Sequence, residues 1–154
     1  KNYYNIGIAV ATDAGLMVPV VENVDEKGIF ELAEEVNDLA ARARERKLTP
    51  AEMKGGTFTI TNFGAIGGEY ATPIINYPET AILGLGAIEK RPVVREVDPD
   101  DSFIGDEGGE EVVAAPTLPL SLSIDHRVID GAVAAQFANT VMDHLEHPLL
   151  LLDS

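Results

Sequence analysis

The chain has 154 residues, 45% of them hydrophobic, which are the size and composition of one globular domain. A formal net charge of -15 argues against binding to nucleic acid or to an anionic membrane, because phosphate contacts need clustered Lys and Arg. The absence of cysteine excludes disulfides, thiolate metal sites and a cysteine nucleophile, and it is compatible with a cytoplasmic location.

The first quarter of the chain predicts a β-hairpin followed by a helix. Residues 5–11 alternate in side-chain size like a strand, residues 13–15 supply a turn, and residues 16–21 read as a second strand in which Pro19 suggests an edge or a bulge. Residues 29–47 carry apolar side chains at helical spacing. Acidic residues gather in the first half of this helix and basic residues at its end, as the helix dipole favours.

A short helix and a strand are expected next. Residues 49–52 match a capping box, and the glycines at 55 and 56 would end the helix that it starts. Residues 57–61 read as a β-branched strand that places its threonines on one face and Phe58 and Ile60 on the other. A glycine-rich loop at residues 62–68 follows.

The second half predicts two more strands and a final helix. Residues 80–87 and 118–125 read as strands, and residues 131–144 as a helix that Pro148 ends. Between the strands, residues 96–111 are rich in Asp, Glu and Gly, which indicates a solvated loop. Strands and helices mixed in this way predict an α/β or α+β layer fold.

His126 is the leading candidate for acid–base chemistry, because the chain has only three histidines. Every second residue of the preceding strand is apolar, and His126 falls at the next position of that alternation. We therefore expect its side chain to project toward the apolar side, where desolvation lowers its pKa and keeps the ring neutral. A hydrogen-bonded core histidine without chemistry is the alternative. Asp130 is suited to cap the next helix, and Arg127 could pair with it and fix the turn.

Other motifs are weak. His144 and His147 could make a zinc pair, but no further ligand is near in sequence, so we expect no metal site. The Gly84-Leu85-Gly86 stretch lacks the third glycine of a dinucleotide-binding motif, and no Gly-x-Ser-x-Gly elbow is present. The residues that would bind a cofactor therefore stay unknown.

A family resemblance adds to this interpretation. Residues 123–131, Ser-Ile-Asp-His-Arg-Val-Ile-Asp-Gly, resemble the Asp-His-Arg-x-x-Asp-Gly signature of the dihydrolipoyl acyltransferases of 2-oxoacid dehydrogenase complexes. Further blocks of that family match in order at residues 4–11, 15–21, 56–64, 73–76 and 78–84. The resemblance implies a chloramphenicol-acetyltransferase-like α/β fold, a two-layer sandwich that has a mixed sheet with helices on one side and forms trimers.

The resemblance also implies a mechanism. His126 would remove the thiol proton of dihydrolipoamide or coenzyme A, and Thr61 would donate a hydrogen bond to the oxyanion from the neighbouring subunit. Asp130 would complete the catalytic set. Structural support of the site would come from Arg127, Gly131 and Asn62. Coenzyme A and lipoamide, the latter carried on a separate lipoyl domain, are the implied cofactors.

The wider assembly follows from the same resemblance. Residues 1–154 would form one catalytic domain that is incomplete at its N-terminus and lacks the lipoyl and subunit-binding domains. The implied partners are a homotrimer that assembles into a large core, a 2-oxoacid decarboxylase and dihydrolipoamide dehydrogenase. The acyl group stays open between acetyl, succinyl and branched-chain groups. A different coenzyme A-dependent acetyltransferase and a non-catalytic scaffold core are the alternatives.

Overall fold

The computed structural model describes residues 2–96 and 109–152. Its main sheet contains β1 (Ile6–Thr12), β2 (Gly15–Met17), β3 (Val20–Val21), β4 (Phe58–Asn62), β5 (Ala81–Leu85) and β8 (Leu120–Ile124). The strand order is β2-β1-β4-β5-β8, and β3 pairs with β1 as well. Strands β1, β4 and β5 run parallel, whereas β8 is antiparallel to β5.

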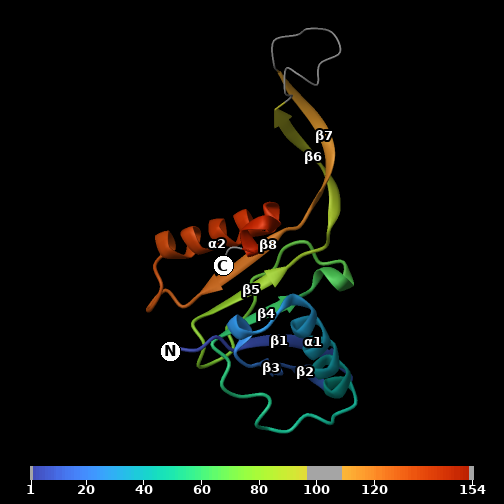
Figure 1. The fold of residues 1–154 in the computed structure, drawn as a ribbon, viewed down its shortest axis with the longest axis vertical. Coiled ribbons are helices and arrows are strands. Elements are labelled where there is room, and N and C mark those ends of the chain that lie inside the picture. Colours follow the sequence, from blue (N-terminus) through green and yellow to red (C-terminus); the bar gives the residue numbers. More distant parts are fainter. Residues whose placement is uncertain (1, 97–108, 153–154) are drawn as a thin grey trace.

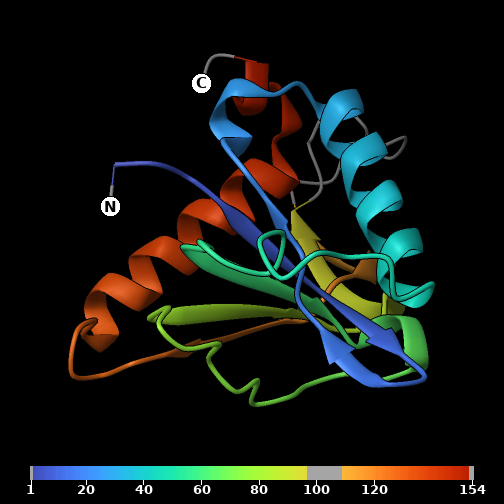
Figure 2. The ribbon, with the colours of Figure 1, turned by 90° about the horizontal axis from the view of Figure 1, so that it is seen from below.

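Two helices, α1 (Ile29–Arg44) and α2 (Gly131–Glu146), cover the same face of this sheet (Figure 1, Figure 2). Helix α1 packs on β1 and β3, and α2 packs on β8. The predicted α/β sandwich with a mixed sheet and helices on one side is therefore confirmed. No helix in the described ranges is long and apolar enough to cross a membrane.

Helix α1 forms where the apolar stripe predicted it, and Ala43 is fully buried against the sheet. It ends before the expected boundary at Lys47, because Arg46 adopts a left-handed backbone with φ of 56°. The Lys47 N–H then donates to the Arg42 carbonyl at 2.8 Å, and the Arg46 N–H donates to the Ala43 carbonyl at 3.1 Å. These two bonds are a Schellman motif, which satisfies the last carbonyl groups of the helix.

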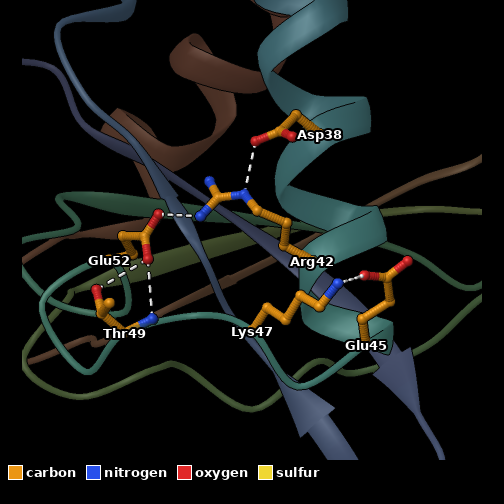
Figure 3. A network of polar contacts seen from close by, with 6 residues as sticks. All are labelled: Asp38, Arg42, Glu45, Lys47, Thr49 and Glu52. Carbon is orange, nitrogen blue, oxygen red and sulfur yellow. Dashed lines mark hydrogen bonds and ion pairs between the residues drawn. The ribbon is translucent and has the colours of Figure 1, made fainter.

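The predicted short helix after Thr49 is wrong, since residues 50–54 form bends and turns. Glu52 does reach back, because one carboxylate oxygen accepts from the Thr49 N–H and hydroxyl at 2.8 Å each. Its other oxygen binds Arg42 of α1 (Figure 3). Its carbonyl accepts from the Val20 N–H at 2.8 Å. The segment therefore links α1 to β3 and does not form a helix, whose nucleation is costly over so few residues.

We expect the substitution Glu52→Gln to make the thermal stability of the fold less dependent on pH in the acid range. Hydrogen bonds from Thr49 and Arg42 lower the pKa of Glu52 from 4.5 to about 2. A depressed folded-state pKa gives stability that is present above the unfolded value and is lost as the pH falls toward 2. Between pH 4.5 and 2, the thermal midpoint of the wild type should fall more steeply than that of Glu52→Gln.

The matched control is Glu45→Gln, because the Glu45 carboxylate forms an ion pair with exposed Lys47 instead (Figure 3). This variant should follow the pH dependence of the wild type. Equal slopes for the wild type and Glu52→Gln would contradict the role of the network.

Strand β4 has two chemically different faces, as the alternation predicted. Phe58 faces the helices, and its ring centroid lies 5.6 Å from that of Phe137 on α2. Thr59 faces the opposite side, where its hydroxyl donates to the buried Glu79 carboxylate at 2.6 Å. Thr61, two residues further along β4, therefore lies on the face of the sheet that the helices leave uncovered.

Strands β6 (Glu89–Glu96) and β7 (Glu110–Thr117) form a separate two-stranded ribbon that stands away from the main sheet (Figure 1). These two strands were not predicted from the sequence. Most of the loop expected at residues 96–111 lies outside the described residues, and the described parts of its two ends belong largely to the strands. An isolated two-stranded ribbon is marginally stable, so we expect the contacts at the base of this ribbon to contribute to its stability.

The C-terminal part agrees with the sequence analysis in its main features. Helix α2 extends two residues beyond the expected end at His144. Pro148 then opens the 3-10 helix η4 (Pro148–Leu152). The side chains of Leu149 and Leu151 are 76% and 51% exposed, so packing on the chain itself leaves much of this tail uncovered.

Close packing after β4 requires glycine at position 64. A Cβ atom on Gly64 would lie 2.1 Å from the carbonyl oxygen of Gly86, a backbone atom that cannot rotate away. We expect Gly64→Ala to destabilise the fold by about 1–3 kcal/mol in urea unfolding. A Cβ atom on Gly131 would meet nothing within 4 Å, so Gly131→Ala should be close to neutral. Equal losses in the two variants would contradict this steric argument.

Candidate functional site

The turn that joins β8 to α2 carries His126, and Asp125 organises it. The Asp125 N–H donates to the Thr80 carbonyl at 2.8 Å, which anchors the start of the turn beside β5. The Asp125 carbonyl accepts from the N–H groups of Val128 and Ile129 at 2.9 and 3.0 Å. The backbone around His126 is thus fixed by hydrogen bonds on both sides.

The side chain of Asp125 adds a second constraint by binding Arg127. Arg127 donates to this carboxylate from Nε at 2.9 Å, from Nη2 at 2.6 Å and from its backbone N–H at 3.0 Å. These bonds lower the pKa of Asp125 to about 2, so the carboxylate is charged at neutral pH. The expected pairing of Arg127 with Asp130 is wrong, because the guanidinium of Arg127 turns back to the nearer acid.

Asp125 is the positioning residue that the sequence analysis did not single out. A signal was available, because it is the first residue of the Asp-His-Arg signature and directly precedes the candidate base.

Asp130 caps helix α2, as predicted. Its Oδ1 atom accepts from the Val133 N–H at 3.0 Å, and its carbonyl accepts from the Ala134 N–H at 3.1 Å. The cap fixes the direction in which α2 leaves the turn. Gly131, the first residue of the helix, has open space around its Cα, so packing within the described chain does not require glycine there.

His126 itself is exposed, and its ring makes no hydrogen bond with any residue that the structure describes. The expectation that it continues the strand parity into the apolar side is wrong, because β8 ends at Ile124 and a turn follows. A groove of about 380 Å³ lies beside the turn, between Asp125 and Arg127 on one side and residues 72–79 on the other. Because the imidazole is exposed, a substrate group can approach it.

Thr61 lies at the opposite end of the sheet. Thr61 pairs with Gly84 of β5, and Gly84 pairs with Ser121 of β8. With strands about 4.8 Å apart and a rise of about 3.3 Å per residue, Thr61 lies roughly 14 Å from Ile124, where β8 ends. His126 follows beyond that point. One chain therefore does not bring the hydroxyl and the imidazole together.

The Thr61 hydroxyl is half-buried and makes no hydrogen bond within the described part of the chain. Asn62 begins the next turn, because its Oδ1 accepts from the Ala65 N–H at 3.2 Å. The turn continues as the 3-10 helix η2 (Gly64–Ile66). This arrangement leaves the Thr61 hydroxyl available as a donor at the end of β4.

The other candidates carry less chemistry. The Nδ1 atoms of His144 and His147 lie 2.8 and 3.2 Å from backbone carbonyl oxygens one turn earlier in α2. No three His, Asp or Glu side chains converge on a metal position within residues 2–96 and 109–152. A larger groove of about 650 Å³ opens on the helix face beside Phe58 and Phe137, but its lining holds no histidine.

The chain resembles known proteins over nearly its whole length. Residues 1–152 match the family model described as the catalytic domain of 2-oxoacid dehydrogenases acyltransferase. The dihydrolipoyllysine-residue acetyltransferase component of the pyruvate dehydrogenase complex from Bacillus subtilis is 51% identical over 152 residues, which cover 99% of this chain and 31% of that protein. The chain thus spans about a third of the length of this relative.

Solved structures agree in fold. The dihydrolipoamide acetyltransferase of Azotobacter vinelandii matches with a TM-score of 0.78 and 46% identity over 94% of this chain and 54% of that one. That structure was used to study a serine, a histidine and an asparagine in the catalytic mechanism. The cubic core of a pyruvate dehydrogenase multienzyme complex matches with a TM-score of 0.78 and 45% identity, again over 94% and 54% of the two chains.

Proposed function

This chain belongs to the family of 2-oxoacid dehydrogenase acyltransferase catalytic domains, and we propose that it transfers an acyl group between dihydrolipoamide and coenzyme A. The turn at residues 125–130 carries the proposal, because it presents a free imidazole on a rigid backbone. Asp130 follows His126 by four positions, the same spacing as that between the histidine and the asparagine studied in the A. vinelandii protein.

In the proposed mechanism, the neutral His126 ring removes the proton from the thiol of coenzyme A or dihydrolipoamide. The thiolate attacks the thioester carbonyl of the other substrate and forms a tetrahedral oxyanion, to which the Thr61 hydroxyl donates a hydrogen bond. The oxyanion then collapses and expels the second thiolate, which takes the proton back from the imidazolium. No covalent bond to the protein forms, which suits a chain without cysteine.

The distance between the two groups indicates where this chemistry takes place. Since Thr61 and the end of β8 that leads to His126 lie at opposite ends of one sheet, the geometry favours a hydroxyl and an imidazole that come from different copies of the chain. We therefore place the site at the boundary between two subunits of a trimer. Such an interface is heterologous and closes into a ring with three equal sites.

Acetyl is the acyl group that we favour, because the B. subtilis relative is an acetyltransferase of a pyruvate dehydrogenase complex. By the same likeness, trimers would assemble into a large core, for which the solved cubic core is the precedent. A 2-oxoacid decarboxylase and dihydrolipoamide dehydrogenase would act with it, lipoamide would arrive on a lipoyl domain, and the assembly would be cytoplasmic.

An acyl-exchange assay on the full-length assembled protein tests this function. Dihydrolipoamide would be offered with acetyl-, succinyl- and isobutyryl-coenzyme A, and product thioester would be measured over time. We expect transfer with the acetyl donor to be fastest. Transfer of the succinyl or branched group at an equal or higher rate would overturn the acetyl assignment. The absence of all transfer would favour a non-catalytic scaffold core.

A further inference from the structure

The loop that follows Thr61, residues 62–71, is bound by Arg91 of β6, which lies near the base of the β6–β7 ribbon. The Arg91 guanidinium donates to the Tyr70 hydroxyl at 3.0 Å and forms an ion pair with Glu69. It also lies over the Tyr70 ring, 5.6 Å from the ring centroid. Two consecutive residues of the loop are thus bound by one side chain of a different element.

Residues 63–68 of the loop are held by their own backbone hydrogen bonds, whereas Glu69 and Tyr70 make no hydrogen bond in the described part of the chain apart from those to Arg91. Three of its residues are glycines, at positions 64, 67 and 68, and Gly67 adopts a positive φ of 86°. The Gly68 carbonyl accepts from the Ala87 N–H at 2.8 Å, while the Ala71 N–H donates to the Ser121 hydroxyl at a long 3.3 Å. A glycine-rich segment gains most from an external contact, because its unconstrained backbone has many accessible conformations.

The position of this loop bears directly on Thr61. Phe63 starts the loop two residues later, and its carbonyl accepts from the Gly68 N–H at 3.1 Å. The Phe63 ring lies on Gly84, where a Cβ atom would be 2.5 Å from the ring. Gly84 is in turn the β5 partner of Thr61. A shift of the loop would therefore move Phe63 and, with it, the end of β4.

We propose that Arg91 is a positioning residue for Thr61, because it fixes the loop that sets the direction of the Thr61 hydroxyl. The inference rests on the proposed role of Thr61, and Arg91 itself touches no reacting atom. The Arg91 and Glu69 side chains are 27% and 48% exposed, so water screens the pair and its contribution to stability is small. Misplacement of a catalytic group by about 1 Å can cost up to 10²-fold in rate, so the effect falls on catalysis.

Arg91→Met in the full-length assembled protein is the test, with Arg95→Met as the matched control. Arg95 lies on the same strand and also pairs with a glutamate, Glu111, but within the ribbon. We expect Arg91→Met to lower kcat about tenfold, with the KM for coenzyme A and the thermal midpoint little changed. Arg95→Met should keep the wild-type kcat.

A double-mutant comparison separates positioning from a general structural effect. If Arg91 acts through Thr61, Arg91→Met should have almost no further effect on kcat in the Thr61→Ala background. A tenfold loss in both backgrounds, or an equal loss in Arg95→Met, would overturn the inference.

Backbone amide exchange gives a readout that does not depend on activity. We expect the Gly68 and Ala71 amides to exchange faster in Arg91→Met than in the wild type and Arg95→Met. Unchanged exchange would overturn the inference even if the acyltransferase assay succeeds. An inactive wild type would instead overturn the proposed function, while the exchange data would still decide whether Arg91 holds the loop.

Discussion

Replacing His126 with glutamine should lower acyl transfer by roughly 10²–10⁴-fold, the loss expected when a general base is removed. Glutamine keeps a hydrogen-bonding side chain of similar reach but cannot take a proton from a thiol. The His126 ring is exposed and has no partner among the described residues, so its replacement should change the stability by less than about 0.5 kcal/mol. Steady-state rates with saturating acetyl-coenzyme A and dihydrolipoamide, beside a thermal unfolding curve, would check both statements.

His144→Gln is the matched control for this prediction. The His144 ring bonds a carbonyl oxygen of α2 near the far end of the helix and makes no contact with the turn. Its loss should leave the rate near that of the wild type. Near-normal transfer by His126→Gln, or an equal loss in the two variants, would show that His126 is not the base.

Elements with a strong local period could be predicted from the sequence. Strand β1, helix α1 and helix α2 each show their period within their own residues, and each was confirmed. The second hairpin strand expected at residues 16–21 is instead interrupted at Val18 and Pro19, and it forms two short strands, β2 and β3, that both pair with β1. The two faces of β4 were also predicted, because alternation alone assigns Phe58 and Thr59 to opposite sides. The end of helix α1 was misplaced, because backbone hydrogen bonds at Arg46, and not the apolar spacing, end the helix.

Elements that depend on distant contacts were missed. Glu52 does reach back to Thr49 as the capping box predicted, but Arg42 of α1 and Val20 of β3 also bind Glu52, and these contacts outside the segment take the place of a helix. The β6–β7 ribbon has valines on both faces, because the consecutive Val93 and Val94 pair with Val113 and Val112, so its sequence lacks the one-sided apolar alternation that marks a half-buried strand.

In the candidate site, too, local features could be predicted from the sequence, whereas side-chain partners and directions could not. The signature identifies His126 and Asp130 as candidates, and the N-cap role of Asp130 follows from its local position. The partner of Arg127 could not be predicted, because Asp125 and Asp130 are both near in sequence and only the three-dimensional geometry decides which of them the side chain binds. The direction of the His126 side chain was also predicted wrongly, because the strand was expected to continue beyond Ile124 and it ends there.

Thr61→Ala should lower acyl transfer by about 10²–10³-fold, the cost of losing one oxyanion donor. The hydroxyl makes no hydrogen bond in the described chain, so its removal breaks no hydrogen bond of the fold. Thr61→Ser keeps the donor and should retain most of the activity. Equal losses in Thr61→Ser and Thr61→Ala would mean that the methyl group, and not the hydroxyl, is the important part of the side chain.

Mixing the two defective chains tests whether the site is shared between copies. In a random one-to-one assembly of His126→Gln and Thr61→Ala chains, each boundary draws its imidazole from one copy and its hydroxyl from the next. About a quarter of the boundaries would then combine two intact groups, so we expect recovery of about a quarter of the wild-type rate. A site within one chain would recover nothing, because every chain in the mixture carries one defect. Since the sheet separates Thr61 from the end of β8 by roughly 14 Å within one chain, we expect recovery.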